Sequence, residues 1–65
     1  MSVEDGMRKA IEQTIGRRLA RNITSEERER ILRPRALMGY EAILDYLSDQ
    51  EKTQKELEEY LQSVD

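Results

Sequence analysis

The sequence has no cysteine and no histidine among its 65 residues. Without cysteine, the chain cannot form a disulfide, a thiolate zinc site or a cysteine nucleophile. Without histidine, it lacks the commonest general base and metal ligand near neutral pH. The fold must therefore be held by packing, within a single helical domain over residues 1–65 whose core is marginal for its size.

Long apolar runs are also missing. No segment approaches the roughly 20 apolar residues needed to span a bilayer. The first five residues, MSVED, are acidic where a secretory signal would be basic. We therefore expect an intracellular, cytoplasmic protein with no membrane partner, and the absence of disulfides suits a reducing compartment.

Proline and glycine are scarce, with one and three copies, and 38% of the residues are charged. This composition favours solvated helices over strands. Apolar spacing and capping patterns predict helices that begin near Ser2 or Val3, at Ser25, at Pro34 and after Thr53. The predicted fold is all-α, a small bundle of three main helices plus a short connecting helix, and we expect it to be oligomeric.

The predicted helix boundaries depend on a few local patterns. Thr24 with Glu27, and Thr53 with Glu56, match the capping box. The segment Asn22-Ile23-Thr24 should end the first helix. Pro34 should break the connecting helix, which otherwise looks solvated, and occupy the first position of the next helix.

Residues 36–64 have two interpretations. In the first, residues 48–52 form a turn and a short amphipathic helix folds back. In the second, one continuous helix presents a coiled-coil seam with two glutamine layers. We favour the turn because a short chain gains more core by folding back, but no glycine or proline interrupts the stretch after Gly39.

The segment from residue 36 to residue 47 is apolar nearly all round, with nine apolar residues among twelve. Such a helix should be buried at the centre of the fold. One face would form the internal core through Leu37, Tyr40, Ile43, Leu44 and Leu47. A second stripe remains, and we predict that it binds a partner: Met38, Ala42 and Tyr46.

Charge is strongly polarised along the chain. Residues 8–35 carry nine basic and four acidic side chains, whereas residues 36–65 carry eight acidic and two basic ones. Arg17, Arg18 and Arg21 have no acid three or four residues away. Either the acidic C-terminal helix folds back onto these arginines, which we favour, or they contact phosphate as part of a larger basic patch. That patch consists of Arg17, Arg18, Arg21, Arg28, Arg30, Arg33 and Arg35.

Nothing in the sequence indicates catalysis. The serines have no histidine to activate them, and the carboxylates of the C-terminal segment lie on a solvated face beside lysines. The acidic spacings do not match a calcium loop. We expect no enzyme activity, no cofactor, no metal and no small-molecule substrate.

One partial resemblance concerns residues 42–47 (AILDYL) followed by residues 53–61 (TQKELEEYL). Together they resemble the first two helices of winged-helix DNA-binding domains. In that family a recognition helix follows at once, and the sequence holds no such segment. The resemblance therefore implies a helix-pair geometry and not DNA reading.

These observations predict a non-catalytic protein-binding or regulatory module, a homodimer or a member of a larger complex. The alternative is a small nucleic-acid-binding accessory protein that uses the arginine patch. The basic half contains no aromatic residue that could stack on bases, which argues against binding to single strands.

Overall fold

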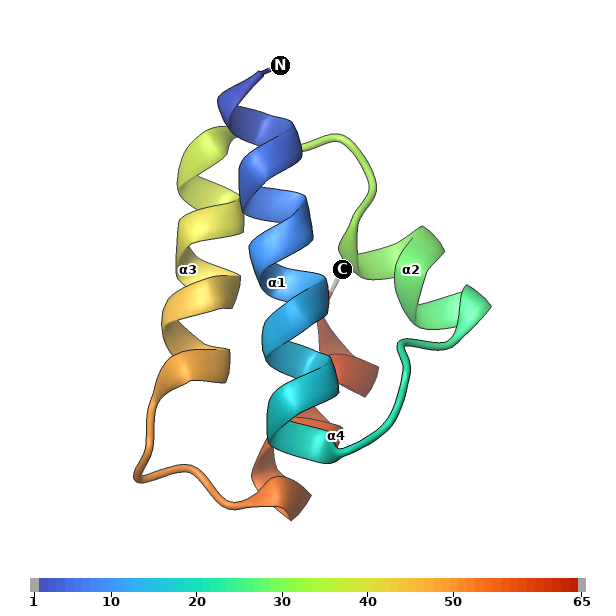
Figure 1. Ribbon diagram of the computed structural model, residues 1–65, viewed down its shortest axis with the longest axis vertical. Coiled ribbons are helices and arrows are strands. Elements are labelled where there is room, and N and C mark those ends of the chain that lie inside the picture. The colour runs from blue at the N-terminus through green and yellow to red at the C-terminus, as the bar shows by residue number, and fades with distance from the viewer. Residues whose placement is uncertain (1, 65) are drawn as a thin grey trace.

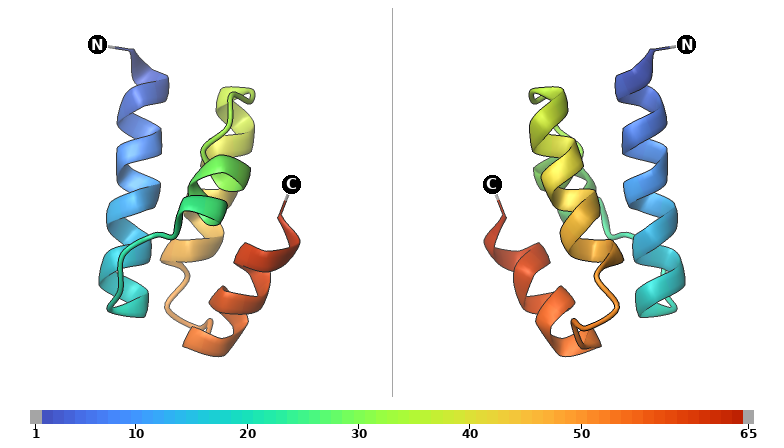
Figure 2. Two further views of the ribbon diagram at one scale, coloured as in Figure 1. Left: turned by 90° about the vertical axis from the view of Figure 1, so that its right-hand side faces the viewer. Right: turned by 90° about the vertical axis from the view of Figure 1, so that its left-hand side faces the viewer.

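The computed structural model describes residues 2–64, which form four α-helices and no strand. These are α1 (Val3–Leu19), α2 (Ser25–Ile31), α3 (Leu37–Ser48) and α4 (Gln54–Ser63). The longest helices, α1 and α3, lie side by side and point the same way (Figure 1). The chain returns from the end of α1 to the start of α3 through α2, which lies on the other side of α1 from α3 in this view. Helix α4 then turns back along the lower part of α3 (Figure 2). The all-α prediction and the turn before the last helix are both confirmed.

Helix α1 begins where the sequence predicted and ends earlier. The Ser2 hydroxyl accepts a hydrogen bond from the Asp5 amide at 3.2 Å, which caps the first turn. The helix stops at Leu19 because Ala20 adopts a left-handed conformation, with φ 54° and ψ 36°. The sequence placed the break at Asn22-Ile23-Thr24. That prediction placed the helix end too far along the chain, because alanine rarely adopts this left-handed cap conformation, which glycine favours.

Both capping boxes are present. The Thr24 hydroxyl accepts from the Glu27 amide at 3.1 Å, and the Thr24 amide donates to the Glu27 carboxylate at 3.0 Å. The same pair of bonds joins Thr53 and Glu56, at 3.1 and 3.2 Å. These local bonds fix the starts of α2 and α4.

Pro34 does not begin α3, contrary to the prediction. The helix starts at Leu37 with Ala36 as its cap residue, and Pro34 lies in the exposed loop before it. This loop is fixed by two contacts from nearby side chains. The Tyr40 hydroxyl donates to the Arg33 carbonyl at 2.9 Å, and the Arg35 guanidinium donates to the Arg30 carbonyl at 2.9 Å.

The core gathers one face of each helix. Its buried apolar residues are Ile11, Ile15, Leu19, Ile31, Leu32, Tyr40, Ile43, Leu47, Leu57 and Leu61. The short connector therefore contributes to the core through its last apolar pair, although the sequence indicated a solvated segment. The predicted internal face of α3 is confirmed at Tyr40, Ile43 and Leu47, which are buried, and was wrong at Leu37, which is 38% exposed.

Candidate protein-binding surface and the arginine contacts

Helix α3 presents an apolar strip to solvent at its N-terminal end. Met38 is 79% exposed, Leu37 is 38% exposed, and Ala42 is also exposed. We call Leu37, Met38 and Ala42 the α3 strip. Val3, 69% exposed, lies at the same end of the molecule because α1 and α3 start there together (Figure 1). The exposed large apolar side chains of residues 2–64 thus occur at one end of the bundle.

Tyr46, the third residue of the predicted partner stripe, is covered within the chain. Its ring stacks on Tyr60 of α4, with centroids 3.9 Å apart and planes inclined by 15°. The Lys52 ammonium lies 5.2 Å from the centre of the Tyr46 ring. Burial raises the pKa of Tyr60. The expectation that Tyr46 lacks internal cover was therefore wrong, while Met38 and Ala42 lie open as expected.

The exposed side of α3 carries only negative charge. Glu41 and Asp45 are both exposed, and the helix contains no lysine or arginine. Their spacing of four residues places them in a row about 60° around the helix from the row of Met38 and Ala42. Leu37, four residues before Glu41, begins this same row, so the acidic residues run directly beside Met38 and Ala42.

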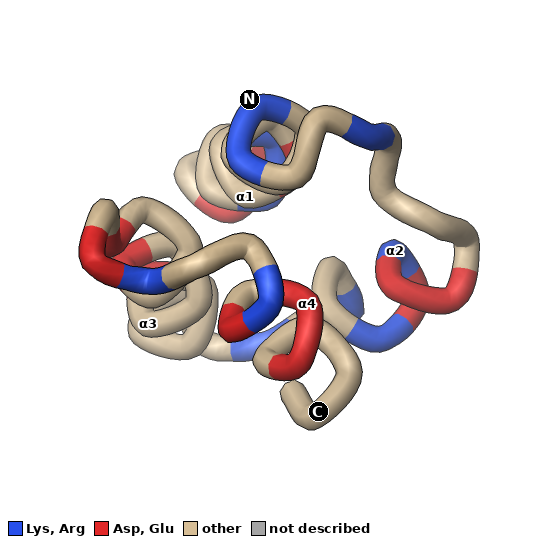
Figure 3. The backbone as a smooth tube through the Cα atoms, turned by 90° about the horizontal axis from the view of Figure 1, so that it is seen from below, with Lys and Arg blue, Asp and Glu red and all other residues tan. Residues whose placement is uncertain are grey.

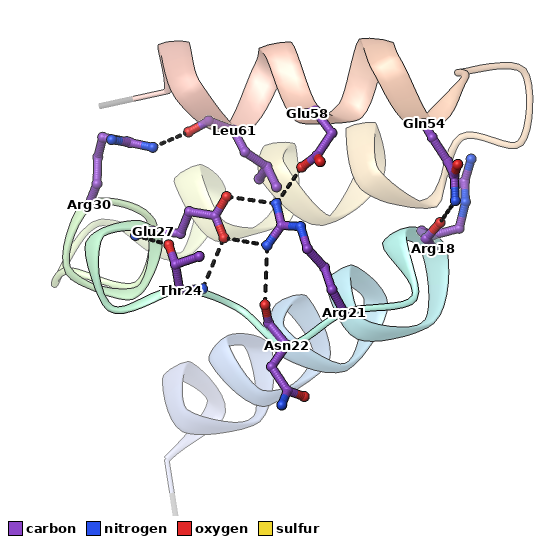
Figure 4. A network of polar contacts seen from close by, with 9 residues as sticks. All are labelled: Arg18, Arg21, Asn22, Thr24, Glu27, Arg30, Gln54, Glu58 and Leu61. Atoms are coloured by element: carbon purple, nitrogen blue, oxygen red, sulfur yellow. Dashed lines mark hydrogen bonds and ion pairs between the residues drawn. The ribbon is translucent and has the colours of Figure 1, made fainter.

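The Arg18 side chain is hydrogen-bonded to backbone carbonyls. Its guanidinium donates to the carbonyl oxygens of Leu47, Asp49 and Lys52 at 2.7, 3.1 and 2.9 Å. The carbonyls at a helix C-terminus have no partner inside the helix and carry its negative dipole end. Arg18 therefore caps α3 and fixes the turn that leads to α4. The side-chain amide of Gln54 in turn donates to the Arg18 carbonyl oxygen at 3.1 Å (Figure 4).

Arg21 joins three parts of the chain. It makes two hydrogen bonds of 2.8 Å to the Glu27 carboxylate, bonds the Glu58 carboxylate, and donates to the Asn22 carbonyl at 3.1 Å (Figure 4). The bonds from Arg21 lower the pKa of Glu27 to about 2, against the opposing effect of burial. The two carboxylates in turn raise the pKa of Arg21. This cluster fastens the end of α1 to α2 and α4.

The remaining arginines of the predicted patch divide into bound and exposed ones. Arg28 pairs with Glu12 at 2.6 Å, which raises the Arg28 pKa. Arg30 donates to the Leu61 carbonyl at 2.6 Å, and Arg35 lies 6.0 Å from the centre of the Tyr40 ring. Arg17 and Arg33 are exposed and contact no acceptor within residues 2–64.

The structure therefore brings an acidic residue of α4 to the arginines, but a single one. Glu58 reaches Arg21, whereas Glu56 serves the capping box and Glu59 is exposed. Helix α2 carries charges of both signs, and the charged residues of α4 are mostly acidic (Figure 3). Five of the seven arginines donate to groups of the protein itself. No pattern in the sequence indicated the role of Arg18, since its acceptors are backbone carbonyls, which every residue carries.

A hollow of about 300 Å³ lies between α1 and α2. Its charged lining is mixed, with Arg8, Lys9 and Arg28 facing Asp5 and Glu12. The Arg28–Glu12 ion pair lies in this lining, so one of the bases is already neutralised. Within residues 2–64, no three acidic side chains gather closely enough to hold a metal ion.

None of the helices between residues 2 and 64 has both the length and the apolar character required to cross a membrane. No protein-family model, curated protein or solved structure matches the chain.

Proposed function

We propose that this protein is a non-catalytic protein-binding module of the adaptor or regulatory type, which contacts its partner through the α3 strip. The exposure of Met38, at 79%, carries the proposal. Burying a methionine side chain against a partner would contribute about 1.5–3 kcal/mol. The opposite face of α3 is already used by the core, so this helix is placed to link the bundle to a second chain.

The arginine contacts favour this proposal over nucleic-acid binding. A phosphate-binding patch needs guanidinium groups that are available to an external anion. Arg18 and Arg21 instead hold the turn after α3 and the junction of α1, α2 and α4. Two of the three arginines in the strongest basic cluster of the sequence thus have structural contacts that require no nucleic acid.

The test is an NMR footprint of the isotopically labelled protein in an extract of its source cells. Partner binding should broaden the amide signals of residues 37–45 selectively, and Met38→Gln should remove the effect. Because Met38 is largely exposed, this change should leave the free energy of unfolding within about 0.5 kcal/mol of wild type. Gln13→Leu, on the exposed face of α1, is the control and should leave the broadening intact.

Broadening spread evenly over all four helices, or unaffected by Met38→Gln, would contradict the proposal. A sedimentation measurement of the purified protein shows whether the partner is a second copy. In that case the wild type sediments as a dimer and the Met38→Gln variant as a monomer.

A further inference from the structure

We infer that the α3 strip receives a basic amphipathic helix of another protein, an inference that rests on the proposed function and specifies its partner. The strip and its acidic neighbours form the exposed side of one helix, with Met38 and Ala42 in one row and Leu37, Glu41 and Asp45 in the next. A partner that covers both rows must bring apolar side chains beside lysines or arginines.

The partner segment should be helical because residues 2–64 have no strand whose edge an extended peptide could join. Between its end turns, the backbone groups of α3 bond one another within the helix, so recognition along the two rows depends on side chains. Two helices pack by placing the side-chain ridges of one into the grooves of the other. The four-residue spacing of Met38 and Ala42 supplies such a ridge.

Charge argues against a second copy of this chain as the occupant. A two-fold interface brings the same patch of both subunits together. Glu41 and Asp45 would then face their own copies, with no base on α3 to separate them. Such like-charge contacts cost several kcal/mol when they are desolvated.

A head-to-tail contact within this sequence does not fit either. The exposed face of α1 carries the bases Lys9 and Arg17, but the residue between them on that face is Gln13. Lys9 and Arg17 of this face could pair with Glu41 and Asp45 of another copy, but Met38 would then pack against polar side chains. The apolar and basic requirements are met together by an amphipathic helix from a different chain.

Three fluorescent peptides of equal length test the inference by anisotropy titration. The first carries leucines on one helical face and lysines on the other. The second has glutamates in place of the lysines, and the third has serines in place of the leucines. The lysine–leucine peptide should bind at least about tenfold more tightly than the other two, because it alone matches both rows.

Variants of the protein locate the binding. Met38→Gln should weaken the lysine–leucine peptide about tenfold at any salt concentration. Glu41→Gln with Asp45→Asn should weaken it several-fold at low salt and little at high salt, since salt screens exposed charges. The control, Glu29→Gln with Glu59→Gln, changes the net charge equally at exposed sites away from α3 and should have a smaller effect.

The inference is overturned if the glutamate peptide binds as tightly, if no peptide binds, or if the α3 variants bind like wild type. It is also overturned if the purified protein is a dimer that Met38→Gln dissociates. Each of these results leaves the proposed function standing when the NMR footprint still falls on residues 37–45. Broadening of the amide signals spread evenly over all four helices would contradict the proposed function itself.

Discussion

Arg18 in α1 donates a 2.7 Å hydrogen bond to the carbonyl oxygen of Leu47, the buried residue near the end of α3. The same guanidinium reaches two further carbonyls in the following turn. One side chain of the first helix thereby fixes both the end of the third helix and the start of the path to α4.

Arg18→Gln should therefore lower the free energy of unfolding by about 2 kcal/mol, because partly buried carbonyls lose a charged donor. Urea unfolding followed by circular dichroism measures the change. The neighbouring Arg17→Gln removes the same charge from an exposed residue and should alter stability by no more than about 0.5 kcal/mol. Equal effects of the two changes would show that net charge, and not the carbonyl contacts, matters.

The Arg21–Glu27 pair should make stability depend on acid pH. The pKa of Glu27 is lowered from 4.5 to about 2, chiefly by the hydrogen bonds from Arg21. Folding thus favours the ionised carboxylate, and this contribution is present above pH 4.5 and lost as the pH falls towards 2. Allowing for solvent at the partly exposed Arg21, we expect a loss of about 2 kcal/mol.

Urea titrations at several pH values measure this loss, with Glu27→Gln as the comparison. The variant should be less stable at neutral pH and should show a smaller decline between pH 5 and pH 2 than wild type, about half or less. A wild-type curve as flat as that of the variant would show that the pair adds no pH dependence. Glu59→Gln, at an exposed residue, should keep the wild-type curve.

Ala20 has the left-handed conformation that favours glycine, with φ 54°. Ala20→Gly should raise stability by about 1 kcal/mol, since relief of backbone strain exceeds the entropy gained by the unfolded chain. The control is the same substitution at an exposed position with helical backbone conformation, Ala42→Gly in α3, which should lower stability by about 1 kcal/mol. Thermal unfolding of both variants decides the sign, and destabilisation by Ala20→Gly would contradict the strain argument.

Pro34→Ala should leave the helix content unchanged, because α3 begins three residues later and the loop is held by side-chain contacts. Tyr40→Phe should instead lower stability by about 1 kcal/mol by removing the hydrogen bond to the Arg33 carbonyl. Far-ultraviolet circular dichroism and urea unfolding test the two changes. A gain of helix signal in Pro34→Ala would show that the proline itself breaks the helix.

Local patterns in the sequence predicted the parts of the fold that depend on neighbouring residues. Both capping boxes were predictable, because this motif needs only two residues three positions apart: Thr24 with Glu27, and Thr53 with Glu56. The exposure of Met38 and Ala42 within the chain was also predictable, because the segment that forms α3 has more apolar residues than one core face can bury. Helix periodicity and local bonds thus accounted for most of the helix boundaries.

Contacts between distant residues were not predictable in this way. Tyr46 meets Tyr60 only because α4 folds back along α3, and Leu37 is partly exposed because no other helix covers that side of it. Arg21 finds Glu27 across the non-helical turn, where the three- and four-residue spacing rule does not apply. These outcomes depend on how the helices are placed, which residue spacing alone does not determine.

The parallel course of α1 and α3 has a consequence for the order of folding. Arg18 and Leu47 meet across 29 residues, whereas α3 and α4 are joined by a short turn. The turn to α4 is short, but Arg18 can hold it only after the contacts between α1 and α3 have closed a long loop, which makes that closure the slow and entropically costly step. A chain cut within residues 32–36 would place Arg18 and Leu47 on separate fragments, so the two fragments should reassemble at a rate that depends on their concentration.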